Sequence, residues 1–366
     1  MKPIALMVVA VGSAFQLASA QTNPAFAGAE GFGRFATGGD GGETVHVTTL
    51  NNSGPGSFRD AVSKSHRTVV FDVGGVIRLK SNVPISSDIS ILGDTAPSNG
   101  ITLYGRSTSF SGQENIIVRY LRFREGIAGD KGKCSVGLSG GRDMIFDHCS
   151  IEWGRWDCLG LTVGSHDITF QNCIIGEGVD PQRFGSLSDS VTNITYTHNL
   201  WINNQSRNPK AKGRIQYVNN VVYNWGVCGL VGGHSAGDHF QDVIGNYFIA
   251  GPNSGKHAAG ECTATDHVFL KGNFVDLDKD GQLNGRELGE ADFGAGEGAP
   301  TFVAAPSNGP LDGLTIEPAP AALNSVLAGA GCSLHRDATD TRLIAAVKSF
   351  GKSGKIIHSE AEVGGL

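Results

Sequence analysis

The residues with the clearest chemical potential lie in a short basic segment, SRNPKAKGR, at positions 206–214. Its cations are Arg207, Lys210, Lys212 and Arg214. Pro209 restricts the backbone, so we expect the segment to present Arg207 in a fixed direction. Arginine binds a carboxylate through two parallel hydrogen bonds, whereas lysine acts as a point charge. The segment therefore predicts an anion site, with a solvated basic turn as the alternative.

Carboxylates form the second group of candidates. They are Asp147, Glu152, Asp157, Glu177 and Asp180. Asp147 interrupts the apolar run IFDHCSIEW, and Asp157 stands in the unusual run WGRWDC. If successive coils of the chain stack, these groups would border the face that carries Arg207. Grouped carboxylate oxygens suit calcium, although each carboxylate taken alone is more often a structural hydrogen-bond acceptor.

Calcium beside a rigid arginine suits proton abstraction from a sugar acid. A metal bound to the sugar carboxylate stabilises the charge that forms when the adjacent carbon loses its proton. The glycosidic oxygen across the bond then leaves, which is β-elimination and consumes no water. A guanidinium is a poor base, so Arg207 would remove the proton only if other cations crowd it; otherwise it would chiefly stabilise charge.

A separate calcium motif lies later in the chain, in DLDKDGQLNGRE. Its expected ligands are Asp276, Asp278, Asp280, the backbone carbonyl of Gln282, and Glu287, with Asn284 near a bridging water and Gly281 at the turn. The preceding HVFLKGNFV favours a strand, and a calcium sensor needs flanking helices and usually a second loop. We predict an EF-hand-like calcium loop that stabilises the fold; a solvated acidic turn is the alternative.

Repeated strand-like segments must position all of these groups. DMIFDHCSI from 143 and DITFQNCII from 167 are followed by later segments of the same pattern. When all of them are superposed, one aligned position forms a column of cysteine and asparagine residues. It contains Cys149, Cys173, Asn199, Asn220, Asn246 and Asn273, at steps of 24, 26, 21, 26 and 27 residues. Such a period indicates a solenoid, in which stacked Asn side chains bond between coils. The sequence predicts an all-β parallel β-helix with Ile145, Ile168 and Ile194 in one interior column; a β-sandwich is the alternative.

The N-terminal residues, the net charge and the cysteine count indicate where the protein acts and which partners it can bind. Residues 1–20 combine Lys2, an apolar run and the ending ASA, which predicts a secretory signal peptide before a single domain over 21–366. A net charge of −6 argues against nucleic acid and anionic membranes as partners, and we expect a secreted monomer. The seven cysteines are an odd number. Cys149 and Cys173 would form a disulfide between coils or remain buried free thiols.

Several segments resemble pectate lyase family 1 of the polysaccharide lyases, over about Ala25 to Gly365. They are AFAGAEGFGRFATGGDGG, TTLNNSGPGSFRDAV, DHCS, SRNPK and KIIHSEAEVGG. The resemblance implies a right-handed single-stranded parallel β-helix of the pectin lyase-like type. It also implies a secreted, calcium-dependent enzyme that cleaves polygalacturonate, an acidic polysaccharide.

The resemblance further implies roles for individual residues. The family motif Arg-x-Pro-x-x-Arg is matched by Arg207, as the catalytic residue, and Pro209, with Lys212 in place of the second arginine. Substrate-binding roles then fall to Lys210, Lys212, Arg214 and Arg183. The first two calcium carboxylates fall on Asp147 and Asp157. The third falls on Leu161, for which Glu177 or Asp180 would substitute, and the family's active-site lysine falls near Arg183 or Phe184.

Three other functions remain open on the sequence. A hydrolase of the same architecture would need paired acids, and the chain has no adjacent Asp-Asp pair. A lyase for methylated pectin would want an aromatic cleft, for which Trp153, Trp156 and Trp201 are candidates. A non-catalytic polysaccharide-binding solenoid would accommodate Leu161 and the missing lysine. An unsaturated product that absorbs ultraviolet light would separate a lyase from the rest.

Overall fold

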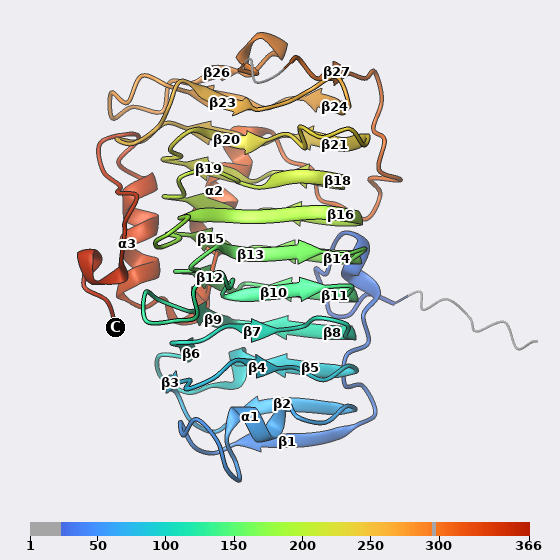
Figure 1. The fold of residues 1–366 in the computed structure, drawn as a ribbon, viewed down its shortest axis with the longest axis vertical. Helices are drawn as coiled ribbons and strands as arrows, with labels where there is room; N and C mark the ends of the chain where they lie inside the picture. Colours follow the sequence, from blue (N-terminus) through green and yellow to red (C-terminus); the bar gives the residue numbers. More distant parts are fainter. Residues whose placement is uncertain (1–22, 295–297) are drawn as a thin grey trace, which may run out of the picture.

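Strands of successive coils stack along one axis, as Figure 1 shows for the computed structural model. The structure describes residues 23–294 and 298–366, so the predicted signal peptide lies outside the described residues. Strands of neighbouring coils pair in parallel, and the terminal pair β25–β26 is antiparallel. This confirms the predicted parallel β-helix and rules out the sandwich, whose strands would pair along two antiparallel sheets.

The strands form three stacks. The first stack comprises β1 (Glu43–Val47), β2 (Arg67–Phe71), β5 (Ile89–Leu92), β8 (Glu114–Arg119), β11 (Arg142–Asp147), β14 (His166–Gln171), the later parts of β16 (Phe184–Thr197) and β18 (Lys210–Val218), β21 (His239–Ile244), β24 (Asp266–Lys271) and β27 (Thr301–Phe302). The second stack comprises β3 (Gly75–Arg78), β6 (Ile101–Tyr104), β9 (Leu121–Arg124), β12 (Ser150–Glu152), β15 (Ile174–Gly176), β17 (Leu200–Ile202), β19 (Val221–Tyr223), β22 (Tyr247–Ile249), β25 (Phe274–Asp276) and β26 (Arg286–Glu287). The third stack comprises β4 (Val83–Pro84), β7 (Thr108–Ser109), β10 (Val136–Ser139), β13 (Asp157–Thr162), the early parts of β16 and β18, β20 (Cys228–Val231) and β23 (His257–Gly260).

The turn from the first to the second stack carries the predicted asparagine ladder. The Oδ1 atom of Asn220 accepts hydrogen bonds from the backbone N (3.1 Å) and Nδ2 (3.0 Å) of Asn199. Asn246 and Asn273 repeat the arrangement in the next coils. These side chains are fully buried, so each bond satisfies a polar group that would otherwise be costly in the interior. The ladder is confirmed, and it fixes the register of the later coils.

The cysteines of the same column are free thiols. Cys149 and Cys173 are buried, and their Sγ atoms lie near the backbone carbonyls of Asp147 (3.5 Å) and Gln171 (3.2 Å). All seven cysteines are free. The structure therefore selects the buried-thiol alternative over an inter-coil disulfide.

The predicted interior column was wrong in the coil that contains β11, where Met144 and not Ile145 occupies the inward position. Met144 pairs with Ile168 and Ile168 pairs with Ile194, so these three point inward. Ile145 pairs instead with Thr169 and faces away from the interior. It is nevertheless fully buried, because an N-terminal segment containing Ala29 and Ala36 packs over it. An apolar residue on the outer face was thus mistaken for a core residue.

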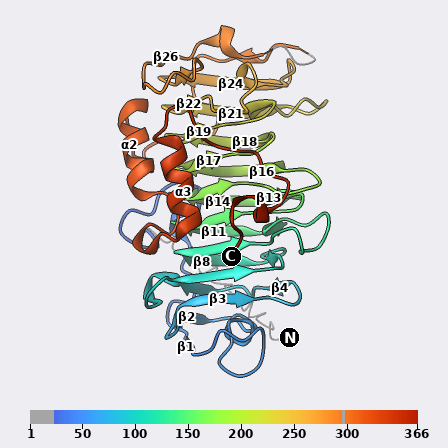
Figure 2. The ribbon, with the colours of Figure 1, turned by 90° about the vertical axis from the view of Figure 1, so that its left-hand side faces the viewer.

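Two helices after the solenoid, α2 (Ala319–Gly329) and α3 (Ala338–Val347), cover the second stack, and the sequence did not predict them. The other helical elements are the short helix α1 (Phe58–Ala61) and the 3-10 turns η1 (Phe32–Phe35), η2 (Gly93–Thr95), η3 (Glu290–Asp292), η4 (Ser333–His335) and η5 (Glu360–Val363). Figure 2 shows α2 and α3 lying side by side against the strands. Leu323 and Leu343 pack there on the outward residues Ile202 and Ile249. Among the described residues, no helix is long and apolar enough to cross a membrane.

Candidate active site

Arg207 lies on the loop that leads into β18, at the edge of the third stack. Its backbone is left-handed, with φ of 64°, and the peptide bond Asn208–Pro209, one residue further on, is cis. Non-glycine residues adopt such a φ where their surroundings hold them in place. Here Ser206 forms a bridge to Phe184 of the preceding coil. The backbone therefore directs the Arg207 side chain over that coil.

Two groups hold the Arg207 guanidinium. Its Nη1 atom lies 3.3 and 3.2 Å from the two carboxylate oxygens of Asp157, and its carbon lies 4.2 Å from the centre of the Phe184 ring. Asp157 is 1% exposed. Burial raises the pKa of Asp157 to about 6, and the charges of Arg207 and Lys210 limit the rise. The predicted pairing of a carboxylate with a rigid arginine is present at these two residues.

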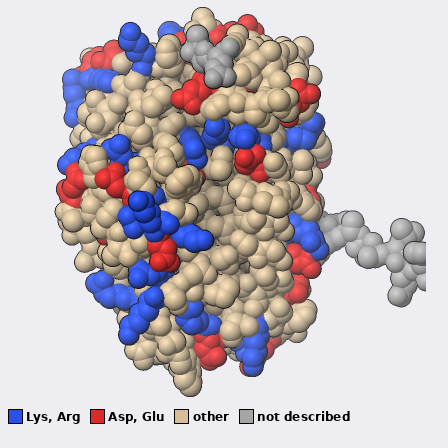
Figure 3. Space-filling model, in the orientation of Figure 1, with Lys and Arg blue, Asp and Glu red and all other residues tan. Residues whose placement is uncertain are grey.

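Two further cations lie on the outer face of β18. Lys210 and Lys212 alternate with buried residues along the strand. Burial, together with the charges of Arg207 and Lys212, lowers the pKa of Lys210. The Nζ atom of Lys212 forms an ion pair with Asp189 at 3.0 Å. In the view of Figure 3, acidic side chains stand among the basic ones, so an anion would be met by a local cluster.

A polar groove lies on the third stack, on coils that precede Arg207 in the chain. It has a volume of about 430 Å³, and its lining includes Ser107, Ser109, Lys133, Ser139 and Thr162. Gly160 of the groove pairs with Leu187, which pairs with Lys210, so groove and cations share one face. The groove could therefore receive an extended polar chain that also reaches Arg207.

The three candidate tryptophans separate by burial. Trp153 and Trp201 are fully buried in the structure, whereas Trp156 is 39% exposed. The backbone N–H of Trp156 donates to the carbonyl of Lys133 at 2.9 Å, at the edge of the groove. Trp156 alone among the three is therefore available to a ligand.

Asp147 does not join this centre. It ends β11 on the first stack, and the second-stack strand β12 separates it from Asp157. Its carboxylate binds Arg119 Nε (2.9 Å), His148 Nδ1 (2.8 Å) and Gln171 Nε2 (2.9 Å). Although burial opposes ionisation, these partners lower the pKa of Asp147. Asp147, predicted as a calcium ligand together with Asp157, is therefore not brought beside it; its carboxylate instead binds Gln171, which holds the N-terminal segment at Gly28 and Glu30.

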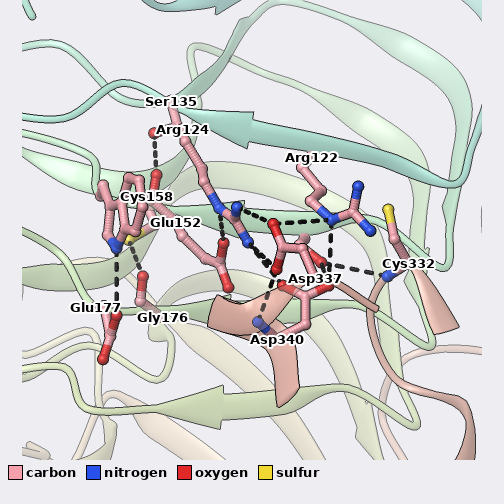
Figure 4. A network of polar contacts seen from close by, with 12 residues as sticks. Arg122, Arg124, Ser135, Glu152, Cys158, Gly176, Glu177, Cys332, Asp337 and Asp340 are labelled. Carbon is pink, nitrogen blue, oxygen red and sulfur yellow. Dashed lines mark hydrogen bonds and ion pairs between the residues drawn. The ribbon is translucent and has the colours of Figure 1, made fainter. Parts of the chain in front are cut away.

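Glu152 and the two predicted substitutes for the third carboxylate, Glu177 and Asp180, also have structural partners. Figure 4 shows Glu152 and Glu177 within a buried ionic network beneath α3. Glu152 pairs with Arg124, which also contacts Asp340, and Glu177 receives Nη1 (2.6 Å) and Nη2 (2.7 Å) of Arg342. Asp180 pairs instead with His358, at 3.1 Å. None of the three contacts Arg207 or Asp157 among the described interactions. Leu161, the expected third position, is fully buried in the core.

Arg214 and Arg183, which were also predicted to bind substrate, have contacts within the fold. Arg214 donates to the carbonyl of Ser307 at 2.7 Å and stacks on Phe240 at 4.1 Å, where β18 joins the first stack. Arg214 thus has contacts within the fold, and its predicted substrate contact stays a prediction. Arg183 lies beside Phe184 and contacts Asp180 at 3.4 Å, at the margin of the centre. The substrate role of Arg183 stays a prediction.

The DLDKDGQLNGRE loop joins β25 to β26, without flanking helices. Its acidic side chains accept bonds from within the loop: Asp276 from Asn284 N (3.3 Å), Asp278 from Asp280 N (3.1 Å), and Asp280 from Gln282 N (2.7 Å). Burial and the charge of Asp278 raise the pKa of Asp276. Glu287 lies in β26. Over residues 23–294 and 298–366, no three His, Cys, Asp or Glu side chains are grouped closely enough to hold a metal ion.

Proteins of similar sequence identify the group to which the chain belongs. It is 44% identical over 342 residues to a probable pectate lyase C of Aspergillus fumigatus, covering 93% of this chain and 81% of that protein. The chain belongs to the pectate lyase family. A probable pectate lyase C of Emericella nidulans is 42% identical, covering 93% of this pectate lyase and 80% of that protein. No family model matches the chain.

Solved structures show the same fold at low identity. The thermostable pectate lyase PL 47 gives a TM-score of 0.61 at 15% identity, covering 83% of this chain and 97% of that one. Pectate lyase Bsp165PelA from Bacillus sp. N165, in complex with trigalacturonate, gives 0.56 at 15% identity, covering 84% and 99%. These pectate lyases therefore support the β-helix fold itself.

Sequence reasoning missed two polar residues, Glu125 and His234, of which His234 contacts one of the cations. Glu125 is buried, and burial raises its pKa to about 7; its carboxylate accepts bonds from the backbone N–H groups of Asp130 and Arg155. His234 lies 2.8 Å from Lys210 Nζ. His234 follows Lys210 by 24 residues, which is close to the coil period, and this spacing was the available signal. Glu125 gave no comparable signal, because it lies outside the repeated segments.

Proposed function

We propose that this protein is a secreted, calcium-dependent pectate lyase that cleaves polygalacturonate by β-elimination, with Arg207 as its catalytic residue. The observation that carries the proposal is the fixed position of Arg207. Asp157 and Phe184 hold it beside Lys210 and Lys212, on the face that also bears the polar groove. The 44% identity to a probable pectate lyase C supports the reaction class.

The cations and the groove match the chemistry of the polymer. Polygalacturonate carries one carboxylate per sugar, so Lys210, Lys212 and Arg207 can meet successive sugars as point charges and as a planar donor. The serine and threonine hydroxyls of the groove suit sugar hydroxyls. A hydrolase is disfavoured because the Arg207 centre presents one carboxylate, Asp157, rather than a pair.

In the proposed complex, Arg207 approaches the acidic carbon of the sugar from the side on which Lys210 and Lys212 lie. Lys210 and Lys212 disfavour a third positive charge there, whereas Asp157 favours it. Once Asp157 is engaged elsewhere, Arg207 can release one guanidinium proton to solvent and then accept the proton of the carbon acid, while the glycosidic oxygen leaves and takes up a proton from solvent. While Asp157 stays paired with it, the charged guanidinium instead stabilises the developing negative charge. Both roles require the guanidinium to stay where Phe184 and Asp157 place it.

Calcium fits the centre only as a site shared with substrate. Asp157 supplies one buried carboxylate, whereas calcium takes six to eight oxygen ligands. We propose that carboxylates of polygalacturonate complete the shell. When bound, the ion would stabilise the charge that develops next to the substrate carboxylate. Asp157 thus has two partners of opposite kind, Arg207 in the free protein and the ion in the complex.

The later loop is proposed as a second, structural calcium site. Asp276, Asp278 and Asp280 crowd negative charge there, and a divalent ion would relieve it. Gly281 N donates to the carbonyl of Phe350 at 3.0 Å, which ties the loop to the segment after α3. An ordered loop would therefore brace the last coils against the C-terminal helices. The leader-like residues 1–20 support secretion, and we propose that the enzyme is secreted and acts as a monomer.

The proposal is tested with purified protein on polygalacturonate and on highly methylated pectin, with calcium and with chelator. We expect an unsaturated, ultraviolet-absorbing product from polygalacturonate in calcium and none in chelator. Shortening of the polymer without that absorbance would mean hydrolysis. Binding without any shortening would mean a non-catalytic solenoid.

A second candidate function is a lyase for methylated pectin. The exposed Trp156 at the groove edge favours it, because an aromatic ring can cover the apolar face of a methylated sugar. Faster product formation from methylated pectin, unaffected by chelator and lost in Trp156→Ala, would select this function.

A further inference from the structure

His234 lies in a tightly built turn next to Lys210. The turn reads VGGHS, and His234 itself has a left-handed φ of 34°. A Cβ on Gly233 would lie 1.9 Å from the His239 ring, and one on Gly232 would lie 2.7 Å from Cys262 Sγ. Gly233 N also donates to Asp266 Oδ1 at 2.7 Å. The backbone before His234 therefore has no room for side chains, and its path fixes the imidazole.

The partners of His234 determine its tautomer. Nδ1 lies 3.1 Å from the backbone carbonyl oxygen of Glu261, and a carbonyl can only accept a hydrogen bond. Nδ1 must therefore carry the proton, which leaves Nε2 of the neutral ring as an acceptor. Lys210 Nζ lies 2.8 Å from Nε2 and is the donor. The imidazole thus links the β18 cation to the loop after β23.

We infer that His234 is a positioning residue that holds Lys210 beside Arg207 for a substrate carboxylate, and that protonation of His234 releases Lys210. The inference rests on the proposed function, because it names how the same site holds its anionic substrate. It adds a residue that acts through Lys210 without touching the reacting atoms.

The chemistry of release follows from charge and hydrogen bonding. Histidine side chains take up a second proton in the range of about pH 5–8. A proton on Nε2 would turn the acceptor into a donor and place two cations at the distance of a hydrogen bond. Lys210 would then leave, because Arg207 and Lys212 repel it more strongly than Glu261 and Asp189 attract it.

The new charge on the ring would not replace the lost contact. The Glu261 carboxylate lies 3.9 Å from Nδ1 and would offset it. His239 does not compete for Lys210, since its Nε2 binds Ser235 Oγ at 2.7 Å. Acidification should therefore weaken substrate binding at Lys210 rather than strengthen it.

Two substitutions separate the halves of the contact. In His234→Asn the amide reaches the position of Nδ1 and keeps the Glu261 bond, but it is too short for Lys210. In His234→Gln the amide oxygen reaches the position of Nε2 and accepts from Lys210, but it does not titrate. Both tolerate the backbone about as well as histidine, Asn in particular. His46→Gln, an exposed site in β1 paired with Asp72, serves as the control.

The experiment measures KM and kcat on polygalacturonate in calcium from pH 5 to pH 8, with melting temperatures for every variant. We expect KM to rise about tenfold in His234→Asn at pH 8 with little change in kcat, because one charge-assisted hydrogen bond is lost. His234→Gln should restore KM at pH 8 and lack the rise in KM that the wild type shows toward pH 5. The titration of Asp157 is common to all variants and cancels in the comparison.

A double-mutant cycle checks that His234 acts through Lys210. Lys210→Ala combined with His234→Asn should bind no worse than Lys210→Ala alone, since coupled residues are not additive. Additive losses, or identical pH profiles in all His234 variants, would overturn the inference while leaving the lyase activity standing. A wild-type protein that forms no product from polygalacturonate would overturn the proposed function and this inference together.

Discussion

Asp157 should make the folded enzyme less stable at neutral pH, and Asp157→Asn should recover that stability. Burial raises the pKa of this carboxyl to about 6 from the usual 3.8. Each tenfold change in an ionisation constant corresponds to about 1.4 kcal/mol, so the charged form costs the fold about 3 kcal/mol. Asp157 is 1% exposed, so solvent screens little of this cost. Asparagine keeps an acceptor for Arg207 and carries no charge.

The sign of the pH dependence follows from the direction of the shift. A carboxyl whose pKa is raised in the folded state contributes its full stability below the unfolded pKa of about 4, and loses that contribution as pH rises through about 6. The variant lacks this group. The difference in unfolding free energy, variant minus wild type, should therefore be near zero at pH 4 and grow to about 1–3 kcal/mol by pH 8.

The assay is urea unfolding at pH 4, 5, 6, 7 and 8 in chelator, followed by tryptophan fluorescence. Glu125 titrates in the same range in both proteins and cancels in the difference. The variant should also lose lyase activity, as expected of a stability cost retained for function. A variant that is less stable than the wild type at pH 8 would show that the ion pair with Arg207 outweighs burial, and the reasoning would fail.

Two further predictions concern the scaffold. Asn220→Ala should lower the unfolding free energy by about 3–5 kcal/mol, because two buried donors of Asn199 lose their acceptor. The control Asn99→Ala, at an exposed position, should change the unfolding free energy little. Equal effects of the two substitutions in urea unfolding would contradict the stabilising role of the asparagine ladder. Asp276→Ala with Glu287→Ala should lower the melting temperature in calcium but spare the rate per folded molecule, whereas a lower rate with unchanged melting would place the loop in the active site.

The fold was predictable where one polar residue repeats in register. The Asn column identified the coils because a buried amide needs the same partner in each neighbour. Side-chain direction was less predictable. Ile145 is apolar yet faces outward, since a distant N-terminal segment covers it. Alternation along a strand cannot reveal a cover that comes from another part of the chain.

The site was predictable where its chemistry is local. Arg207, Lys210 and Lys212 lie within six residues, and their clustering survives in the structure. Asp147 and Asp157 are ten residues apart, but a short second-stack strand puts them on different faces. The spacing likewise did not show that the position of Leu161 points into the core, where a charged side chain would be buried. Counting residues along a coil does not give the face on which each one lies.

The central claim is that Arg207 performs β-elimination on polygalacturonate. The most direct test is the initial rate of unsaturated product formation in calcium by the wild type and by Arg207→Ala, with circular dichroism to show that both are folded. The account predicts rapid product formation by the wild type and loss of about a thousandfold or more in the variant. A folded Arg207→Ala that works at a rate near that of the wild type would contradict it.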